Sequence, residues 1–192
     1  MATLAEKARA CRECESVLPL GPRPILQVHS DARILLASQA PGRIAHQSGV
    51  PFQDASGRRL RDWMGISEPE FYAPENVAIL PMGFCYPGRG AGGDLPPRPE
   101  CAAIWRRQFL YRFDGIRLTL VIGQHAQKWH FDRKAPGSVA EQARRWMEQG
   151  GDRVPMPHPS PRNNVWLSRN PWFETRFLPR LRSAVRNALA GE

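Results

Sequence analysis

Four cysteines are the residues whose type and spacing suggest chemistry most directly. Cys11 and Cys14 form a CxxC pair, whereas Cys85 and Cys101 are widely separated along the chain. Four thiolates can complete a tetrahedral zinc site or hold a [4Fe–4S] cluster. A zinc ribbon ordinarily uses two close CxxC pairs, and the second pair here is too widely spaced for that. On spacing alone the alternatives are a cluster, a zinc ion and incidental buried cysteines.

Residues 38–53 (SQAPGRIAHQSGVPFQ) form a second group with chemical potential. The Pro41-Gly42 pair predicts a sharp turn, and NH groups after such a turn can face an oxyanion or a small ring. Phe52 offers a flat face on which a base could stack, although a phenylalanine equally often belongs to the core.

Residues 157–164 (PHPSPRNN) form the third group. His158 lies between two prolines, which restrict the backbone on either side of it. A histidine held in this way can donate a hydrogen bond to charge that develops on a leaving group, although a single histidine in a turn is more often structural. Ser160 could bind a phosphate, and Arg162 could bind a phosphate or enter a base stack.

The elements that must position these groups alternate between strands and helices. Short apolar runs predict strands, and longer amphipathic segments between them predict helices. This alternation predicts an α/β fold with a mostly parallel sheet, in which ligands bind at the carboxyl ends of the strands. The predicted strands are 33–38, 76–80, 118–123 and 153–156, and the predicted helices are 57–64, 100–111, 138–149 and 171–189.

Length and charge narrow the class of protein. The 192 residues, 42% of them hydrophobic, suit one domain spanning residues 1–192. A net charge of +9 favours a nucleic acid as partner, although a merely solvated basic surface is the alternative. No apolar run is long enough for a bilayer, and residues 1–14 lack the apolar core of a signal peptide. We therefore expect a cytoplasmic protein, without a membrane partner, in which cysteines stay reduced or bind metal.

Taken together, the three groups resemble the uracil-DNA glycosylase superfamily, and its iron–sulfur branch, family four, in particular. That branch has a GExPG…GxPF pattern after the first strand, a cysteine after the second strand, another cysteine further on, and HPS near the end. The order and spacing of the motifs carry the resemblance from residue 11 to about residue 185. The matching residues are Ser38–Gly42, Gly49–Phe52, Cys85, Cys101 and His158–Ser160, with Cys11 and Cys14 matching the N-terminal CxxC.

The resemblance implies a three-layer α/β/α sandwich with a four-stranded parallel sheet. It implies a [4Fe–4S] cluster on Cys11, Cys14, Cys85 and Cys101, with zinc as the alternative. It also implies hydrolysis of an N-glycosidic bond after the nucleotide is flipped into a pocket. By this resemblance, Phe52 would stack on the base and His158 would stabilise the leaving base. Gln39 and the backbone at Ala40 would shape the pocket and place water. Ser160 would contact a phosphate, and Arg162 would occupy the wedge position in the duplex.

Four departures from the family pattern bear on this expectation. Ala40 stands where the best-known branch has an aspartate, and residues 43–46 lack the acidic run that often follows the PG pair. Pro81 stands where a base-recognising asparagine is usual, and its side chain offers no hydrogen bond. Residues 88–95 lack the histidine of the covalent DNA-trapping branch, so we expect no covalent capture.

We therefore expect a monomeric, monofunctional glycosylase that excises uracil from single- and double-stranded DNA. A glycosylase for another deaminated base is one alternative. A DNA-damage-binding protein without catalytic activity is a second, because Ala40 and Pro81 remove polar groups. A zinc-dependent RNA-binding module is a third.

Overall fold

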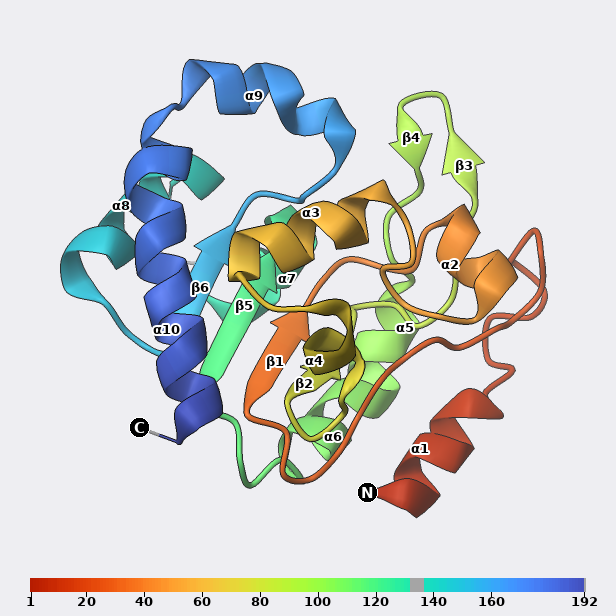
Figure 1. Cartoon of the computed structure of the whole chain (residues 1–192). Helices are drawn as coiled ribbons and strands as arrows, with labels where there is room; N and C mark the ends of the chain where they lie inside the picture. The colour runs from red at the N-terminus through yellow and green to blue at the C-terminus, as the bar shows by residue number, and fades with distance from the viewer. Residues whose placement is uncertain (132–136, 192) are drawn as a thin grey trace.

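A four-stranded parallel sheet forms the centre of the protein (Figure 1). The computed structural model describes residues 1–131 and 137–191. The strand order is β2-β1-β5-β6, with Ile34 level with both Val77 and Leu118. All four predicted strands are confirmed, each within two residues at either end. Their bounds are β1 Ile34–Ala37, β2 Val77–Ile79, β5 Leu118–Ile122 and β6 Arg153–Met156.

Helices cover both faces of this sheet. Every residue of β1 is apolar, and alternate residues of a strand point to opposite faces, so both faces present apolar side chains that must be buried. Ile34 and Leu36 pack in one buried cluster with residues of α3 (Ala55–Met64) and α10 (Leu178–Ala190). Leu35 packs in a second cluster with α1 (Ala2–Arg9) and with Phe109 of α6 (Arg107–Leu110). The three-layer α/β/α sandwich is confirmed.

The predicted helices are present, with some differences at their ends and in their winding. Residues 99–110 are wound as α5 (Pro99–Cys101), the π-helix η1 (Ala102–Arg106) and α6. The last helix likewise begins as the π-helix η3 (Phe173–Phe177) before α10. The apolar spacing predicted helices here, but it does not distinguish π from α winding. The helix predicted over 138–149 is α8 (Val139–Gln149), for which Ser138 forms a capping box with Glu141.

Several elements were not predicted, and most of them are too short for a clear periodic signal. A two-stranded hairpin, β3 (Arg89–Gly90) and β4 (Gly93–Asp94), projects beyond the sheet in Figure 1. The remaining elements are α2 (Arg43–Ser48), α4 (Glu68–Tyr72), α7 (Gly123–His130), the 3-10 turn η2 (Pro161–Asn163) and α9 (Asn164–Arg169).

Within the described ranges, no helix is both long enough and apolar enough to cross a membrane.

An antiparallel bridge protects the edge of the sheet at β2. Gln27 pairs with Ile79 through two backbone hydrogen bonds of 2.7 and 3.0 Å. The Gln27 side chain also donates to the Val77 carbonyl at 2.7 Å. An unpaired edge strand invites association with other chains, and this segment occupies that position. It also leads the N-terminal segment, with Cys11 and Cys14, back to the core.

Candidate functional site

An open cleft of about 470 Å³ lies at the carboxyl end of the sheet. This is the edge where doubly wound sheets bind ligands, and a space of this size suits one nucleotide unit. The loops after β1, β2 and β6 all contribute to it. Every residue that we predicted to act on a substrate lines this cleft, namely Gln39, Ala40, Phe52, His158, Ser160 and Arg162.

Backbone hydrogen bonds join the loops that form one wall of the cleft. The Met82 NH donates to the Ser38 carbonyl at 2.8 Å, and the Gly83 NH donates to the Gln39 carbonyl at 2.9 Å. These bonds continue the pairing of β1 and β2 beyond the strands. They bring Gln39 and Pro81 into the same wall, although Pro81 is itself largely buried.

Phe52 occupies a strained turn between the core and the cleft. Its φ of 56° lies in the left-handed region, which is uncommon for a bulky residue and is found most often at functional sites. The ring is partly buried and meets Phe71 edge to face, with 6.1 Å between the centroids. Phe52 therefore packs against the core through Phe71 and also lines the cleft.

His158 also lines the cleft and lies in the loop after β6. Burial lowers the pKa of its imidazole, and the nearby carboxylates of Asp54 and Asp94 oppose that shift. The ring is therefore neutral near pH 7 and carries one NH donor. The Asn163 side chain donates to the His158 carbonyl at 2.6 Å and so holds the backbone beneath the ring.

The loop after β6 that carries His158, Pro159 and Ser160, called the HPS loop below, is hydrogen-bonded to α3 and to the β3–β4 hairpin. Arg59 of α3 donates to the Ser160 carbonyl at 3.0 Å. The Arg162 guanidinium donates to the Gly92 carbonyl of the β3–β4 hairpin at 3.1 Å. Arg162 is exposed at the mouth of the cleft.

Two carboxylates in the cleft were not predicted from the sequence. Asp54 is the N-cap of α3, and its Oδ1 accepts the Gly57 NH at 2.9 Å. Asp94 lies on β4 and also lines the cleft. The pattern of an aspartate immediately before a helix, two residues after Phe52, was the available signal for Asp54. Nothing local distinguishes Asp94 from an ordinary turn residue.

A fully buried arginine supports the loop after β2 from behind. Arg106, on η1, donates to the carbonyls of Leu80 and Pro81 at 2.9 and 3.3 Å. Burial lowers its pKa to about 9. A second guanidinium nitrogen contacts the Nε2 of His130, and the guanidinium stacks over the Trp129 ring at 4.8 Å. This contact requires a neutral imidazole as acceptor.

We expect the arginine–histidine contact to make the fold sensitive to acid. Burial, with Arg106 and Arg153 nearby, lowers the pKa of His130 from 6.5 to about 3. Between those values the unfolded chain binds a proton at this site that the folded protein does not, so stability falls as the pH falls. The contribution is about 1.4 kcal/mol per pH unit.

Urea unfolding at a series of pH values between 6.5 and 4.5 measures this effect. His130→Gln keeps a hydrogen-bond acceptor for Arg106 but removes the group that ionises. The free energy of unfolding of this variant should therefore depend less steeply on pH, by about 1.4 kcal/mol per pH unit. His29→Gln, which changes an exposed histidine, is the matched control. Parallel curves for the wild type and the His130 variant would contradict the assignment.

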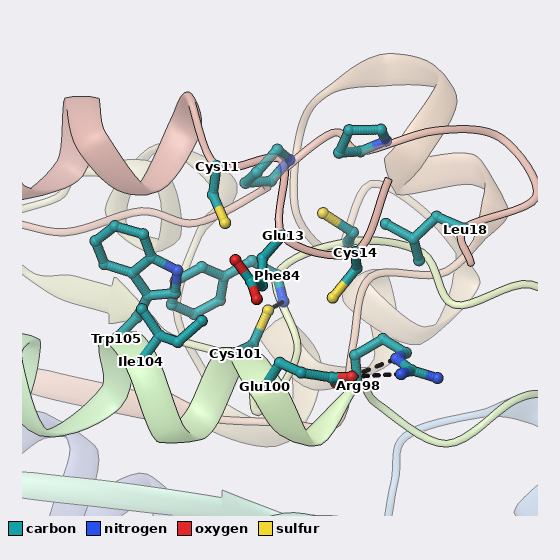
Figure 2. A pocket seen from close by; sticks show the side chains of 13 residues that line it. Cys11, Glu13, Cys14, Leu18, Phe84, Arg98, Glu100, Cys101, Ile104 and Trp105 are labelled. Atoms are coloured by element: carbon teal, nitrogen blue, oxygen red, sulfur yellow. Dashed lines mark hydrogen bonds and ion pairs between the residues drawn. The ribbon is translucent and has the colours of Figure 1, made fainter. Parts of the chain in front are cut away.

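A second cavity gathers the four cysteines on the other side of the β2 loop. All four line it, none forms a disulfide, and all except Cys11 are buried. Figure 2 shows the labelled Cys11, Cys14 and Cys101 around a common space, between Trp105 and Leu18. The Phe84 NH donates to the Cys101 sulfur at 3.5 Å. The fold therefore brings Cys11 and Cys14 to the same cavity as Cys85 and Cys101, and a metal group shared by all four would require this.

The cavity around these thiols has mostly apolar walls, although the charged side chains of Glu13, Arg98 and Glu100 also line it. Burial, with a smaller contribution from the neighbouring cysteines, raises the pKa of Cys85 to about 12 and that of Cys101 to about 11. Within residues 1–131 and 137–191, no three His, Cys, Asp or Glu side chains are arranged to hold a single metal ion as they stand. The four sulfurs surround a space and do not converge on one point.

A parallel sheet covered by helices on both faces, with a cleft at its carboxyl edge, places the protein in the α/β class whose members bind ligands at that edge. A family model of the Uracil DNA glycosylase superfamily matches residues 27–182. The chain belongs to this superfamily. Membership supports DNA as partner and a glycosylase-type hydrolase of DNA repair as function. The matched range contains Cys85 and Cys101 but neither Cys11 nor Cys14, so the match does not extend to the full cysteine set.

Proposed function

We propose that this protein is a monofunctional DNA glycosylase that flips uracil out of single- or double-stranded DNA and hydrolyses its N-glycosidic bond. The observation that carries the proposal is the single cleft in which Phe52 and His158 face the same space at the carboxyl edge of the sheet. A reactive carbon inside a base stack cannot be reached, so the nucleotide must leave the duplex and enter such a cleft.

The two residues have different tasks in this reaction. Phe52 stacks on the flipped base, an interaction that holds any base because every base has a π face. The base leaves with the electron pair of the broken bond, and negative charge grows on its oxygen. The neutral imidazole of His158 donates a hydrogen bond to that oxygen, where a fixed donor contributes most in the transition state. Gln39 and the backbone at Ala40 shape the pocket, and Ser160 binds a phosphate.

An excision assay on a panel of oligonucleotides tests the proposal. Single and double strands carrying uracil, hypoxanthine or xanthine are incubated with excess protein, and abasic sites are revealed by alkali. We expect alkali-dependent cleavage at uracil. Cleavage without alkali would contradict a monofunctional mechanism, and cleavage only at another base would transfer the proposal to that base.

A second candidate function follows from Ala40 and Pro81, which leave the cleft with fewer polar side chains than the family pattern offers. In that case the protein binds DNA damage without chemistry. Retained binding to uracil-containing DNA, with no abasic site on any strand of the panel, would favour this candidate over the glycosylase.

We also propose that Cys11, Cys14, Cys85 and Cys101 hold one [4Fe–4S] cluster. Four free sulfur donors lining one mostly apolar cavity fit this group, because thiolates are the ligands that iron–sulfur clusters use. When bound, the cluster would act as a cross-link between the N-terminal segment and the loop after β2. That loop includes Pro81, so the cross-link would also support one wall of the cleft.

Arg162 should matter more for duplex DNA than for single strands. We propose that it occupies the space that the flipped base vacates, and only a duplex requires its stack to be opened. Arg162→Ala should therefore lower the single-turnover excision rate on paired uracil about tenfold more than on single-stranded uracil. Arg169→Ala removes the same charge from exposed α9 and is the matched control. If Arg162→Ala lowers the excision rate equally on both substrates, Arg162 contacts a phosphate and does not enter the base stack.

A further inference from the structure

A second hollow, outside the cleft, has a basic lining. This open groove of about 640 Å³ lies between α7 on one side and the segment wound as α5, η1 and α6 on the other. Its lining includes Arg98, Arg107, His125 and Lys128, and among the described residues that line it there is no aspartate or glutamate. None of these basic residues takes part in the reaction proposed above.

Arg107 and Lys128 supply the net positive charge of the groove. Both are exposed, and neither forms an ion pair with another described residue. Arg98, by contrast, is paired with Glu100, as Figure 2 shows. Burial and the nearby Lys128 lower the pKa of His125, so its imidazole is neutral near pH 7 and adds no charge. Two cations without carboxylate partners therefore lie on the two elements that border the groove.

Trp129 adds an exposed aromatic ring to the same groove. The residue is 39% exposed, although tryptophan is highly buried on average. The Arg106 guanidinium lies over the ring at 4.8 Å from its centroid, and the His130 ring meets it edge to face. These contacts fix the ring before any ligand arrives, so stacking on it costs little ordering.

The combination of charge and an aromatic ring suits an unpaired nucleic-acid strand. Proteins hold single strands in positively charged grooves that track the backbone, with aromatic side chains on which bases stack. In a duplex the bases stack on one another, so an aromatic ring beside the duplex does not reach a base face. The groove also begins where the cleft ends, because Pro81 lines the cleft and the next residue, Met82, lines the groove.

We propose that this groove binds the single-stranded DNA that flanks the target nucleotide. Arg107 and Lys128 contact its phosphates, and Trp129 stacks on one of its bases. This inference goes beyond the excised nucleotide, and it rests on the function proposed above only for DNA as the substrate. The groove then strengthens the binding of single strands in particular, the opposite of the preference expected for Arg162.

Charge reversal in the groove tests the phosphate contacts. Fluorescence anisotropy measures the affinity for a uracil-free single strand of about 16 nucleotides and for the blunt duplex that contains it. Arg107→Glu and Lys128→Glu should each lower single-strand affinity about tenfold and duplex affinity no more than about twofold. Arg186→Glu makes the same charge change on exposed α10, which packs on the other face of the sheet, and is the matched control.

The salt dependence gives a second measure of the same contacts. Each phosphate contact to a single strand contributes about 0.7 to the slope of log affinity against log salt concentration. In the double variant Arg107→Ala with Lys128→Ala, this slope should therefore fall by about 1.4 for the single strand.

A strand without bases tests the role of Trp129. Trp129→Ala should lower the affinity for the single strand about fivefold or more, and Trp129→Phe should keep most of it because a flat face remains. On a strand of abasic spacers, which keeps the phosphates, wild type and Trp129→Ala should bind equally. Thermal unfolding checks the fold, and any loss of folded protein would lower both affinities alike, so the comparison of the two strands remains decisive.

The outcomes separate this inference from the glycosylase. Single-turnover excision at saturating protein should be unchanged in every groove variant, because the cleft is intact. Losses on the single strand no larger than that of Arg186→Glu, or equal losses on single strand and duplex, would overturn the inference and leave the glycosylase standing. A wild type that leaves no abasic site, while the groove variants still lose single-strand affinity, would overturn the glycosylase and leave this inference standing.

Discussion

His158→Ala should slow excision by between about a hundredfold and a thousandfold in single-turnover assays, the loss expected for one donor to a developing anion. The affinity for uracil-containing DNA should hardly change. The hydrogen bond gains most of its strength only when the base carries negative charge, and an interaction confined to the transition state affects rate and not binding. A Phe52→Ala variant should differ by losing affinity as well as rate, because stacking also holds the flipped base before reaction.

The control for this experiment is His125→Ala. His125 lies on α7 outside the lining of the cleft, and it should leave both rate and affinity unchanged. Full excision activity in the His158 variant would refute the proposed role of His158, while the proposal that the protein is a glycosylase would stand. A loss of affinity equal to the loss of rate would instead mean that the imidazole binds the ground state.

Cys85→Ser should abolish the iron content of anaerobically purified protein and leave it poorly soluble, with weakened DNA binding. The wild type should carry about four iron atoms per chain and a brown colour, and the variant fewer than about one. The expected damage is large because Cys85 lies in the buried contact among Cys14 and Leu18, where losing the cluster would free the N-terminal segment. Metal analysis and visible absorbance are the measurements.

Leu18→Ala separates ligand loss from packing loss. It creates a cavity in the same small cluster without removing a thiol, so it should lower stability while the iron content stays near the wild-type value. About one zinc and no iron per wild-type chain would contradict the cluster and leave zinc as the bound metal. Wild-type iron content in Cys85→Ser would show that this residue is not a ligand.

Most of the sheet could be predicted from the sequence because its strands are buried on both faces. Each strand is then a nearly continuous apolar run between turn residues, as in residues 34–37 and 118–122. The turns that follow them carry the cleft residues, and that arrangement follows from parallel topology alone. The placement of Phe52 and His158 in one cleft was therefore within reach of the sequence.

The remaining features depend on contacts between distant segments. The Asp94 carboxylate and the Arg162–Gly92 contact require the β3–β4 hairpin to fold towards the HPS loop, and its two-residue strands have no periodic signal. Arg106 was assigned only to a helix, since an apolar period does not reveal that a charged residue is wholly buried and bonded to Pro81. Burial of such a residue depends on partners supplied by the whole fold.

The turn at Phe52 restricts how the protein can evolve. A Cβ on Gly57 would lie 1.6 Å from the Phe52 carbonyl oxygen, so any side chain there would push the turn away from α3. Replacing Phe52 with glycine would relieve the left-handed backbone but would remove the aromatic face. Neither position offers a gradual route to greater stability, and a selection for heat tolerance should therefore accumulate substitutions elsewhere while these two residues stay unchanged.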